Sequence, residues 1–163
     1  MNCTGVVDCG VRIQKGVKTH CNNITVIDPV TYGCFVNQNG WENSLSNIHI
    51  TRLLNSLGGT GLFVYGSDNT FSDVVVIGCQ TGVVNIGADN HYTKVHPWTT
   101  TSALDNLKQS ISFDCRWSYC TFSQCMGDST NIIFKISNIM ENHTYDEFIL
   151  NPYPLFRSGS TPR

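Results

Sequence analysis

Two aspartates are the first candidates for chemistry, because they occupy the same place in a stretch that occurs twice. The sequence GSDN at 66–69 returns as GADN at 87–90, so Asp68 and Asp89 are 21 residues apart. Glycoside hydrolases use two carboxylates about 5 to 9.5 Å apart. If the two stretches stack, this pair falls near the lower limit of that range. The alternative, which the recurrence favours, is that each Asp only stabilises a turn through local backbone hydrogen bonds.

A third candidate acid, Glu42, stands beside an aromatic residue. Glu42 is the only Glu outside the C-terminal tail, and it follows Trp41 in NQNGWENS, a stretch too polar for a core. Flat aromatic faces can stack on sugar rings, so we interpret Trp41 and Trp98 as candidate carbohydrate contacts. Trp98 stands where the chain is expected to leave the repeated core as a loop over 99–109. Packing of loops against the core is the alternative role for both rings.

Two histidines, His91 and His96, flank the end of the second copy. Imidazoles near neutral pH suit a general base or a metal ligand, and we count both residues among the candidate carbohydrate contacts. Their spacing of five residues on an extended chain predicts opposite faces, so we expect no shared metal and no cofactor. The 21-residue offset also places Lys94 over Asp73. This pair is interpreted as a surface ion pair or, alternatively, as part of a lyase site.

The elements that must position these residues are short strands with a repeat. Apolar runs that open with glycine recur at intervals of 23, 28 and 21 residues, and asparagines follow them at intervals of 24, 22 and 21 residues. The glycines are Gly10, Gly33, Gly61 and Gly82, and the asparagines are Asn23, Asn47, Asn69 and Asn90. Two registers in step predict an all-β parallel β-helix of about five coils, with both sets of residues at equivalent corners. Neighbouring coils then lie about 4.8 Å apart.

Composition narrows the function classes. The chain has 163 residues, enough for one domain, and a net charge of −2 without a basic run, so a nucleic-acid partner is not expected. No apolar stretch approaches the length of about 18 residues that a membrane span requires. The N-terminus does not resemble a signal peptide. The eight cysteines lack the pairwise spacing of zinc sites and occupy apolar positions in strand-like runs, which predicts mostly free, buried thiols.

The stretch GSDNTFSDVVVIGCQTGVVNIGADNHYTKVHPW (66–98), together with CMGDSTNIIFKI (125–136), resembles a known group of proteins. These are phage tail-spike and preneck-appendage proteins with a right-handed, single-stranded parallel β-helix, within the pectate-lyase-like superfamily. The resemblance spans about 10–139. It implies a β-helix core over 1–139, which can be a fragment of a longer chain, and a capping segment or tail over 140–163.

The resemblance also implies a function and a setting. The expected partner is a host cell-surface polysaccharide, the expected assembly is a homotrimer, and the expected location is the virion tail or another extracellular site. Three interpretations stay open: a glycan-contacting module without catalysis, an active polysaccharide hydrolase or lyase, and a structural shaft or secreted adhesin. The candidate catalytic residues under the second interpretation are Asp68, Asp89 and Glu42.

Overall fold

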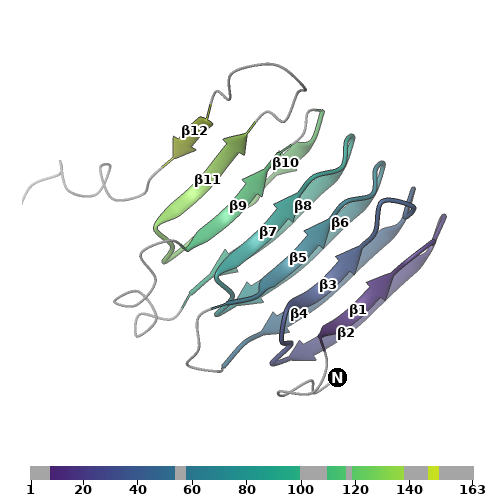
Figure 1. The fold of residues 1–163 in the computed structure, drawn as a ribbon, viewed down its shortest axis with the longest axis horizontal. Coiled ribbons are helices and arrows are strands. Elements are labelled where there is room, and N and C mark those ends of the chain that lie inside the picture. Colours follow the sequence, from purple (N-terminus) through teal and green to yellow (C-terminus); the bar gives the residue numbers. More distant parts are fainter. Residues whose placement is uncertain (1–7, 54–57, 100–109, 117–118, 138–146, 151–163) are drawn as a thin grey trace, which may run out of the picture.

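The chain folds as an all-β parallel β-solenoid of about five turns, which confirms the predicted fold class (Figure 1). The computed structural model describes residues 8–53, 58–99, 110–116, 119–137 and 147–150. These residues contain twelve strands and no helix: β1 (Cys9–Ile13), β2 (His20–Ile27), β3 (Tyr32–Val36), β4 (Ser44–Thr51), β5 (Thr60–Val64), β6 (Thr70–Ile77), β7 (Thr81–Asn85), β8 (His91–Trp98), β9 (Ile111–Cys115), β10 (Thr121–Ser123), β11 (Ile132–Ser137) and β12 (Glu147–Leu150).

The strands form two sheets, and each coil gives one strand to each sheet. One sheet has the order β1-β3-β5-β7-β9-β11-β12, and the other has the order β10-β8-β6-β4-β2. All neighbours are parallel except β12, which runs antiparallel beside β11. Figure 1 shows the coils stacked side by side from β1 to β11, with the two sheets as two layers. No helix among the described residues is long and apolar enough to cross a membrane.

The hydrophobic core lies between the two layers and is built from columns of equivalent residues. One column from the five-stranded sheet consists of Leu45, Phe71, Tyr92 and Phe122. The ring centroids of Phe71 and Tyr92 are 5.0 Å apart, and those of Tyr92 and Phe122 are 4.7 Å apart. Stacked aromatic pairs contribute about 0.5 to 1.5 kcal/mol each beyond the area they bury. The solenoid is therefore held by ladders of side chains as well as by strand pairing.

The four repeated glycines stack in one column, as predicted, but they lie inside strands. Each is the second residue of β1, β3, β5 or β7, so the prediction that they mark corners is wrong. A Cβ built on Gly61 would lie 2.2 Å from Cγ1 of Val76 and 2.7 Å from the carbonyl oxygen of Gly82. Glycine is needed there because the facing sheet approaches too closely for a side chain.

The four repeated asparagines lie in two columns, so the prediction that they form one is also wrong. Asn23 stacks on Asn47, whereas Asn69 and Asn90 continue a column that includes Asn43. The two columns run four residues apart along the chain, and Asn43 precedes Asn69 by 26 residues. The interval of 22 residues from Asn47 to Asn69 is therefore not a coil length, although it is close to one, because these two residues belong to different columns.

The described cysteines are free thiols, as predicted. There are seven of them: Cys9, Cys21, Cys34, Cys79, Cys115, Cys120 and Cys125. Cys34, Cys79 and Cys115 are buried, and the other four are half-buried. Burial raises the pKa of Cys79 to about 12, because the interior disfavours the thiolate. Cys3 lies outside the described residues.

Candidate functional site

The same local structure recurs at one corner of each of the first four coils. The sequence glycine, any residue, a left-handed residue, then Asn or Thr occurs at 16–19, 40–43, 66–69 and 87–90. The left-handed residues form a column whose φ values lie between 53° and 65°: Lys18, Glu42, Asp68, Asp89 and Tyr119. Backbone hydrogen bonds fix their register, since Asp68 N donates to Ala88 O at 3.1 Å and Glu42 N donates to Ser67 O at 3.4 Å. All three candidate acids thus lie in one column on successive coils.

The asparagines beneath this column hold the corner together. Asn69 Oδ1 accepts hydrogen bonds from the backbone N and Nδ2 of Asn43, at 3.0 and 2.9 Å. Asn90 Oδ1 accepts the equivalent bonds from Asn69, at 2.9 and 3.1 Å. Amides on successive coils therefore stack and hydrogen-bond to one another. Asn69 and Asn90, expected at the corners, do not adopt the left-handed conformation themselves, because the preceding Asp adopts it. The other two repeated asparagines, Asn23 and Asn47, do adopt it, with φ values of 57° and 52°.

The acids themselves supply little of this hydrogen bonding. Asp68 and Asp89 are exposed, and in the described part of the chain neither takes part in a salt bridge. Glu42 Oε2 lies 3.3 Å from Lys18 Nζ in an exposed ion pair. The carboxylates of Asp68 and Asp89 are thus left on the surface of the solenoid edge, and a ligand can reach them.

Exposed aromatic side chains lie at both ends of the row formed by Glu42, Asp68 and Asp89. Trp41 precedes Glu42 and is 52% exposed, and its Nε1 donates to Gln38 O at 3.0 Å. Tyr119 occupies the position of Asp89 one coil later and is 77% exposed. Three coil spacings, about 14 Å, separate the coil of Trp41 from the coil of Tyr119. We name this edge, made of Trp41, Glu42, Asp68, Asp89 and Tyr119, the acid edge.

His91 lies beside the acid edge, in the neighbouring exposed column. Its Nδ1 is 2.7 Å from Oγ1 of Thr121, one coil away. The same column carries Ser44 and Thr70 in earlier coils. The acid edge is thus bordered by hydroxyl and imidazole groups at a regular spacing.

His96 and Trp98 lie apart from the acid edge, toward the other end of β8. His96 is half-buried and belongs to the column of His49 and Val75, and its Nε2 is buried without a hydrogen-bond partner among the described residues. Trp98 is half-buried and ends β8, where it bridges to Asp128. The structure therefore brings five of the seven predicted site residues together and leaves these two elsewhere.

The prediction that His91 and His96 point to opposite faces is wrong. Lys94, between them, has a left-handed φ of 52°, and it interrupts the alternation of the strand. Tyr92 and Val95 are consequently both buried although they are three residues apart. Both histidines therefore belong to outward-facing columns. Within the described ranges, no group of three or more His, Cys, Asp or Glu residues is arranged to hold a metal ion.

The predicted pair of Asp73 and Lys94 is confirmed as a surface contact. Lys94 Nζ lies 3.8 Å from Asp73 Oδ1, and both side chains are 59% exposed. An exposed pair of this kind contributes about 0 to 1 kcal/mol. The contact supports the ion-pair interpretation without adding a group that resembles a lyase site.

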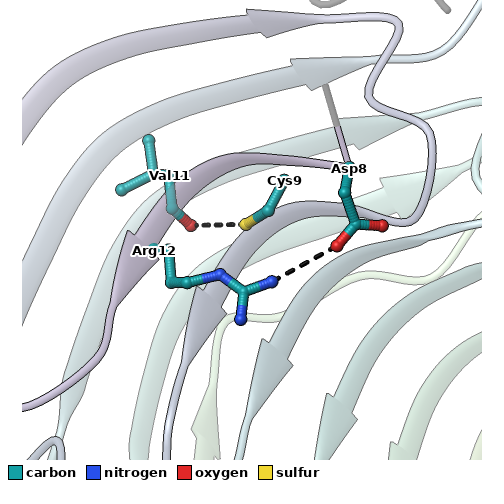
Figure 2. A network of polar contacts seen from close by, with 4 residues as sticks. All are labelled: Asp8, Cys9, Val11 and Arg12. Carbon is teal, nitrogen blue, oxygen red and sulfur yellow. Dashed lines mark hydrogen bonds and ion pairs between the residues drawn. The ribbon is translucent and has the colours of Figure 1, made fainter. Parts of the chain in front are cut away.

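A second aromatic surface, on the seven-stranded sheet, was not anticipated. The rings of Phe35 and Phe63 stack with centroids 5.3 Å apart, and Tyr32 lies 5.1 Å from each. The guanidinium carbon of Arg12 lies 4.7 Å above Phe35. Figure 2 shows that Arg12 is also held by Asp8, at 3.3 Å. The alignment of GCFV with GLFV in the sequence was the signal for this stack, since it places both Phe residues in the same position.

The same figure shows a local contact within β1, beside this surface. The Sγ of Cys9 donates to the carbonyl oxygen of Val11 at 2.9 Å (Figure 2). Burial is the main cause that raises the pKa of Cys9. Cys9 therefore acts here as a neutral donor that satisfies a backbone carbonyl.

Sequence reasoning missed one end of the acid edge. Tyr119 belongs to a copy of the corner in which Cys120 replaces the Asn, so no repeat of the letters marks it. The copy at 40–43 was detectable in the sequence, because GWEN has the same pattern as GSDN at 66–69: a glycine, any residue, an acid and an Asn. Of the loop predicted over 99–109, residues 100–109 lie outside the part of the chain that the structure describes.

Comparison with known proteins does not assign the chain to a family. A scan of protein-family models, a search of curated proteins and a search of solved structures each returned no match to the chain. The site is therefore interpreted from its own residues.

Proposed function

We propose that this β-solenoid is a module that contacts a cell-surface polysaccharide along the acid edge. One observation carries the proposal: three carboxylates on successive coils lie between two exposed aromatic side chains, Trp41 and Tyr119. Sugar rings offer apolar faces that stack on aromatic rings, and they offer hydroxyl groups that donate to carboxylates. A repeating polymer laid along the solenoid axis meets an equivalent group at every coil spacing.

The charge of the edge favours one class of glycan. Glu42 is paired with Lys18, whereas Asp68 and Asp89 leave two negative charges on neighbouring coils. Like charges brought together at an interface oppose binding, so polyuronates are disfavoured. The expected ligand is a neutral or amino-sugar polysaccharide.

The proposed setting is the surface of a virion tail or another extracellular site, with a homotrimer as the assembly, in line with the resemblance to tail-spike proteins.

Removal of Trp41 tests the binding proposal. Trp41→Ala is expected to lower the affinity for a bound wall or capsular polysaccharide at least about tenfold, or about 1.4 kcal/mol, through loss of the stacking surface. Leu53→Ala is the matched control, because Leu53 is 66% exposed and lies beyond the far end of β4. Affinity is measured by isothermal calorimetry on glycans selected from an array. Equal effects of the two substitutions would contradict the proposal.

A hydrolase is the second candidate, favoured by the spacing of the acids. Adjacent coils place carboxylates about 4.8 Å apart along the backbone, near the separation of about 5 Å in retaining glycosidases. Release of reducing sugar from neutral polysaccharides, measured beside absorbance of unsaturated uronates, separates hydrolase, lyase and non-catalytic binding. We expect binding without release of either product.

Asp89→Asn distinguishes a corner residue from a catalytic one. Asn tolerates the left-handed conformation, so the free energy of unfolding is expected to change by less than about 0.5 kcal/mol. Asp89→Leu is expected to cost about 1 to 2 kcal/mol, because Leu is strained at a φ of 53°. Both values are obtained from urea denaturation. Glycan cleavage by the parent protein that disappears in Asp89→Asn would instead establish the catalytic role.

A further inference from the structure

A cluster of polar side chains interrupts the apolar interior between the fourth and fifth coils. We name it the polar cluster, and it consists of Asn85, Asn90, Tyr92, Cys115 and Cys120. Asn85 and Cys115 end β7 and β9, at the position where β3 and β5 carry Val36 and Val64. Cys120 stands in the corner position that Asn90 occupies one coil earlier. Polar groups in a core need partners, and these groups find them in one another.

The amide of Asn85 lies at the centre of the polar cluster. Its Oδ1 accepts hydrogen bonds from Tyr92 Oη at 2.6 Å and from Asn90 Nδ2 at 2.9 Å. On the other side of the amide, the nitrogen donates to the carbonyl oxygen of Gly87 at 2.7 Å and also faces the two sulfurs. Asn85 Nδ2 lies 3.0 Å from Cys120 Sγ and 3.9 Å from Cys115 Sγ. A single amide group thus touches both thiols.

The two thiols differ in their surroundings. A hydrogen bond from the Cys115 thiol, followed by bonds from the Asn90 backbone and the Asn85 amide, lowers the pKa of Cys120 from 9.0 to about 7, although burial acts against this. Burial raises the pKa of the half-buried Cys125 instead. Cys115 is only 6% exposed, whereas Cys120 is half-buried. Cys120 is therefore the thiol that a reagent from solvent meets first.

We propose that Cys120 and Cys115 form a dithiol that reacts with hydroperoxides and closes to an internal disulfide. The Cys120 thiolate attacks one peroxide oxygen, the O–O bond breaks, and Cys120 becomes a sulfenic acid while hydroxide leaves. The Cys115 sulfur then attacks the sulfur of Cys120, and the sulfenic oxygen departs as water after taking up a proton. Two thiols and hydrogen peroxide give one disulfide and two waters, and each sulfur loses one electron.

The geometry assigns the order of these steps. Cys115 already directs its hydrogen bond to the sulfur that it would attack, and Asn85 holds both sulfurs on one side of its amide. The resulting bond joins the end of β9 to the corner that precedes β10. Oxidation therefore restrains the corner that carries Tyr119.

The unmodified protein provides the first test. After treatment with a small excess of hydrogen peroxide and blocking of the remaining thiols, peptide mapping is expected to show one disulfide, between Cys115 and Cys120. Without peroxide, iodoacetamide is expected to modify Cys120 about tenfold faster than Cys125 at pH 7, with a half-maximal rate near pH 7. A disulfide between other cysteines, or both of these thiols recovered unoxidised, would overturn the proposal.

Substitutions separate the attacking thiol from the resolving one. In Cys115→Ser, Cys120 is expected to persist as a sulfenic acid that dimedone traps, without any disulfide. Cys125→Ser is the matched control, because Cys125 is a half-buried thiol of the same coil, and the disulfide is expected to form as before. Should Cys115→Ser fail to fold, the peptide map and the pH profile of the unmodified protein decide the question alone. Dimedone labelling of Cys125 rather than Cys120 would refute the assignment.

Discussion

Asn69→Ala is expected to destabilise the protein by about 3 to 4 kcal/mol, among the largest effects of any single substitution in the described chain. The side chain is fully buried and bonds to both neighbouring coils. Its loss leaves the backbone N of Asn43 and the carbonyl oxygen of Gly40 without partners in the interior. An unpaired buried polar group costs about 1 to 3 kcal/mol, so two such groups account for most of the effect.

Urea denaturation followed by circular dichroism measures this change in the free energy of unfolding. Asn22→Ala is the control, since Asn22 is exposed in β2, and it is expected to change the free energy by less than about 0.5 kcal/mol. A loss below about 1 kcal/mol for Asn69→Ala would mean that the amide ladder is replaced by water without penalty. The repeated Asn would then not be what holds the corner.

Gly87→Ala is expected to cost at least about 3 kcal/mol, or to abolish folding, for a steric reason. A Cβ on Gly87 would lie 1.8 Å from the carbonyl oxygen of Gly66, which belongs to the backbone of the coil before. A side chain can rotate away from a clash, but a carbonyl held in the stack cannot. The coils must therefore separate at this corner, which weakens the bonds that Ile86 N and Gly87 N donate to Val64 O.

The matched control for this prediction is Gly40→Ala, at the same corner of an earlier coil. There the nearest atom to an added Cβ is Cγ1 of Val36, at 2.7 Å, and a side chain can move. The cost is expected to be at least about 1 kcal/mol smaller than for Gly87→Ala. Melting temperatures of the two variants give the comparison. An equal loss in both would show that the stacked carbonyl is not the cause.

The sequence was sufficient to predict the solenoid, because spacing constraints act along the stack. A glycine is required at each close approach of the sheets, so Gly10, Gly33, Gly61 and Gly82 record the coil lengths directly. The stacking of Asn69 on Asn90 followed from the same 21-residue offset. Periodicity thus predicted the equivalence of the four glycines and of Asn69 with Asn90, but it wrongly joined Asn23 and Asn47 to the same column.

The details of the site depended on backbone conformations that residue type does not reveal. Lys94 adopts a left-handed φ although it has no special tendency to do so, because the turn is imposed by the column to which it belongs. That one residue reverses the side to which His96 points. Tyr119 joined the acid edge for the same reason: its position is set by the register of β10 on β8, a contact between segments distant in sequence.

The corner that carries Asp68 and Asp89 also sets how the gene can change in length. The 21 residues from 66 to 86 complete one coil and contain a corner glycine, a left-handed Asp and an Asn of the amide ladder, so they form one repeat unit. In a stacked array each unit contacts only its neighbours. An in-frame duplication of this unit places glycine on glycine, Asn on Asn and carboxylate on carboxylate. Such a duplication lengthens the acid edge by one step while every existing ladder is preserved, which makes recombination within this stretch a route to longer variants.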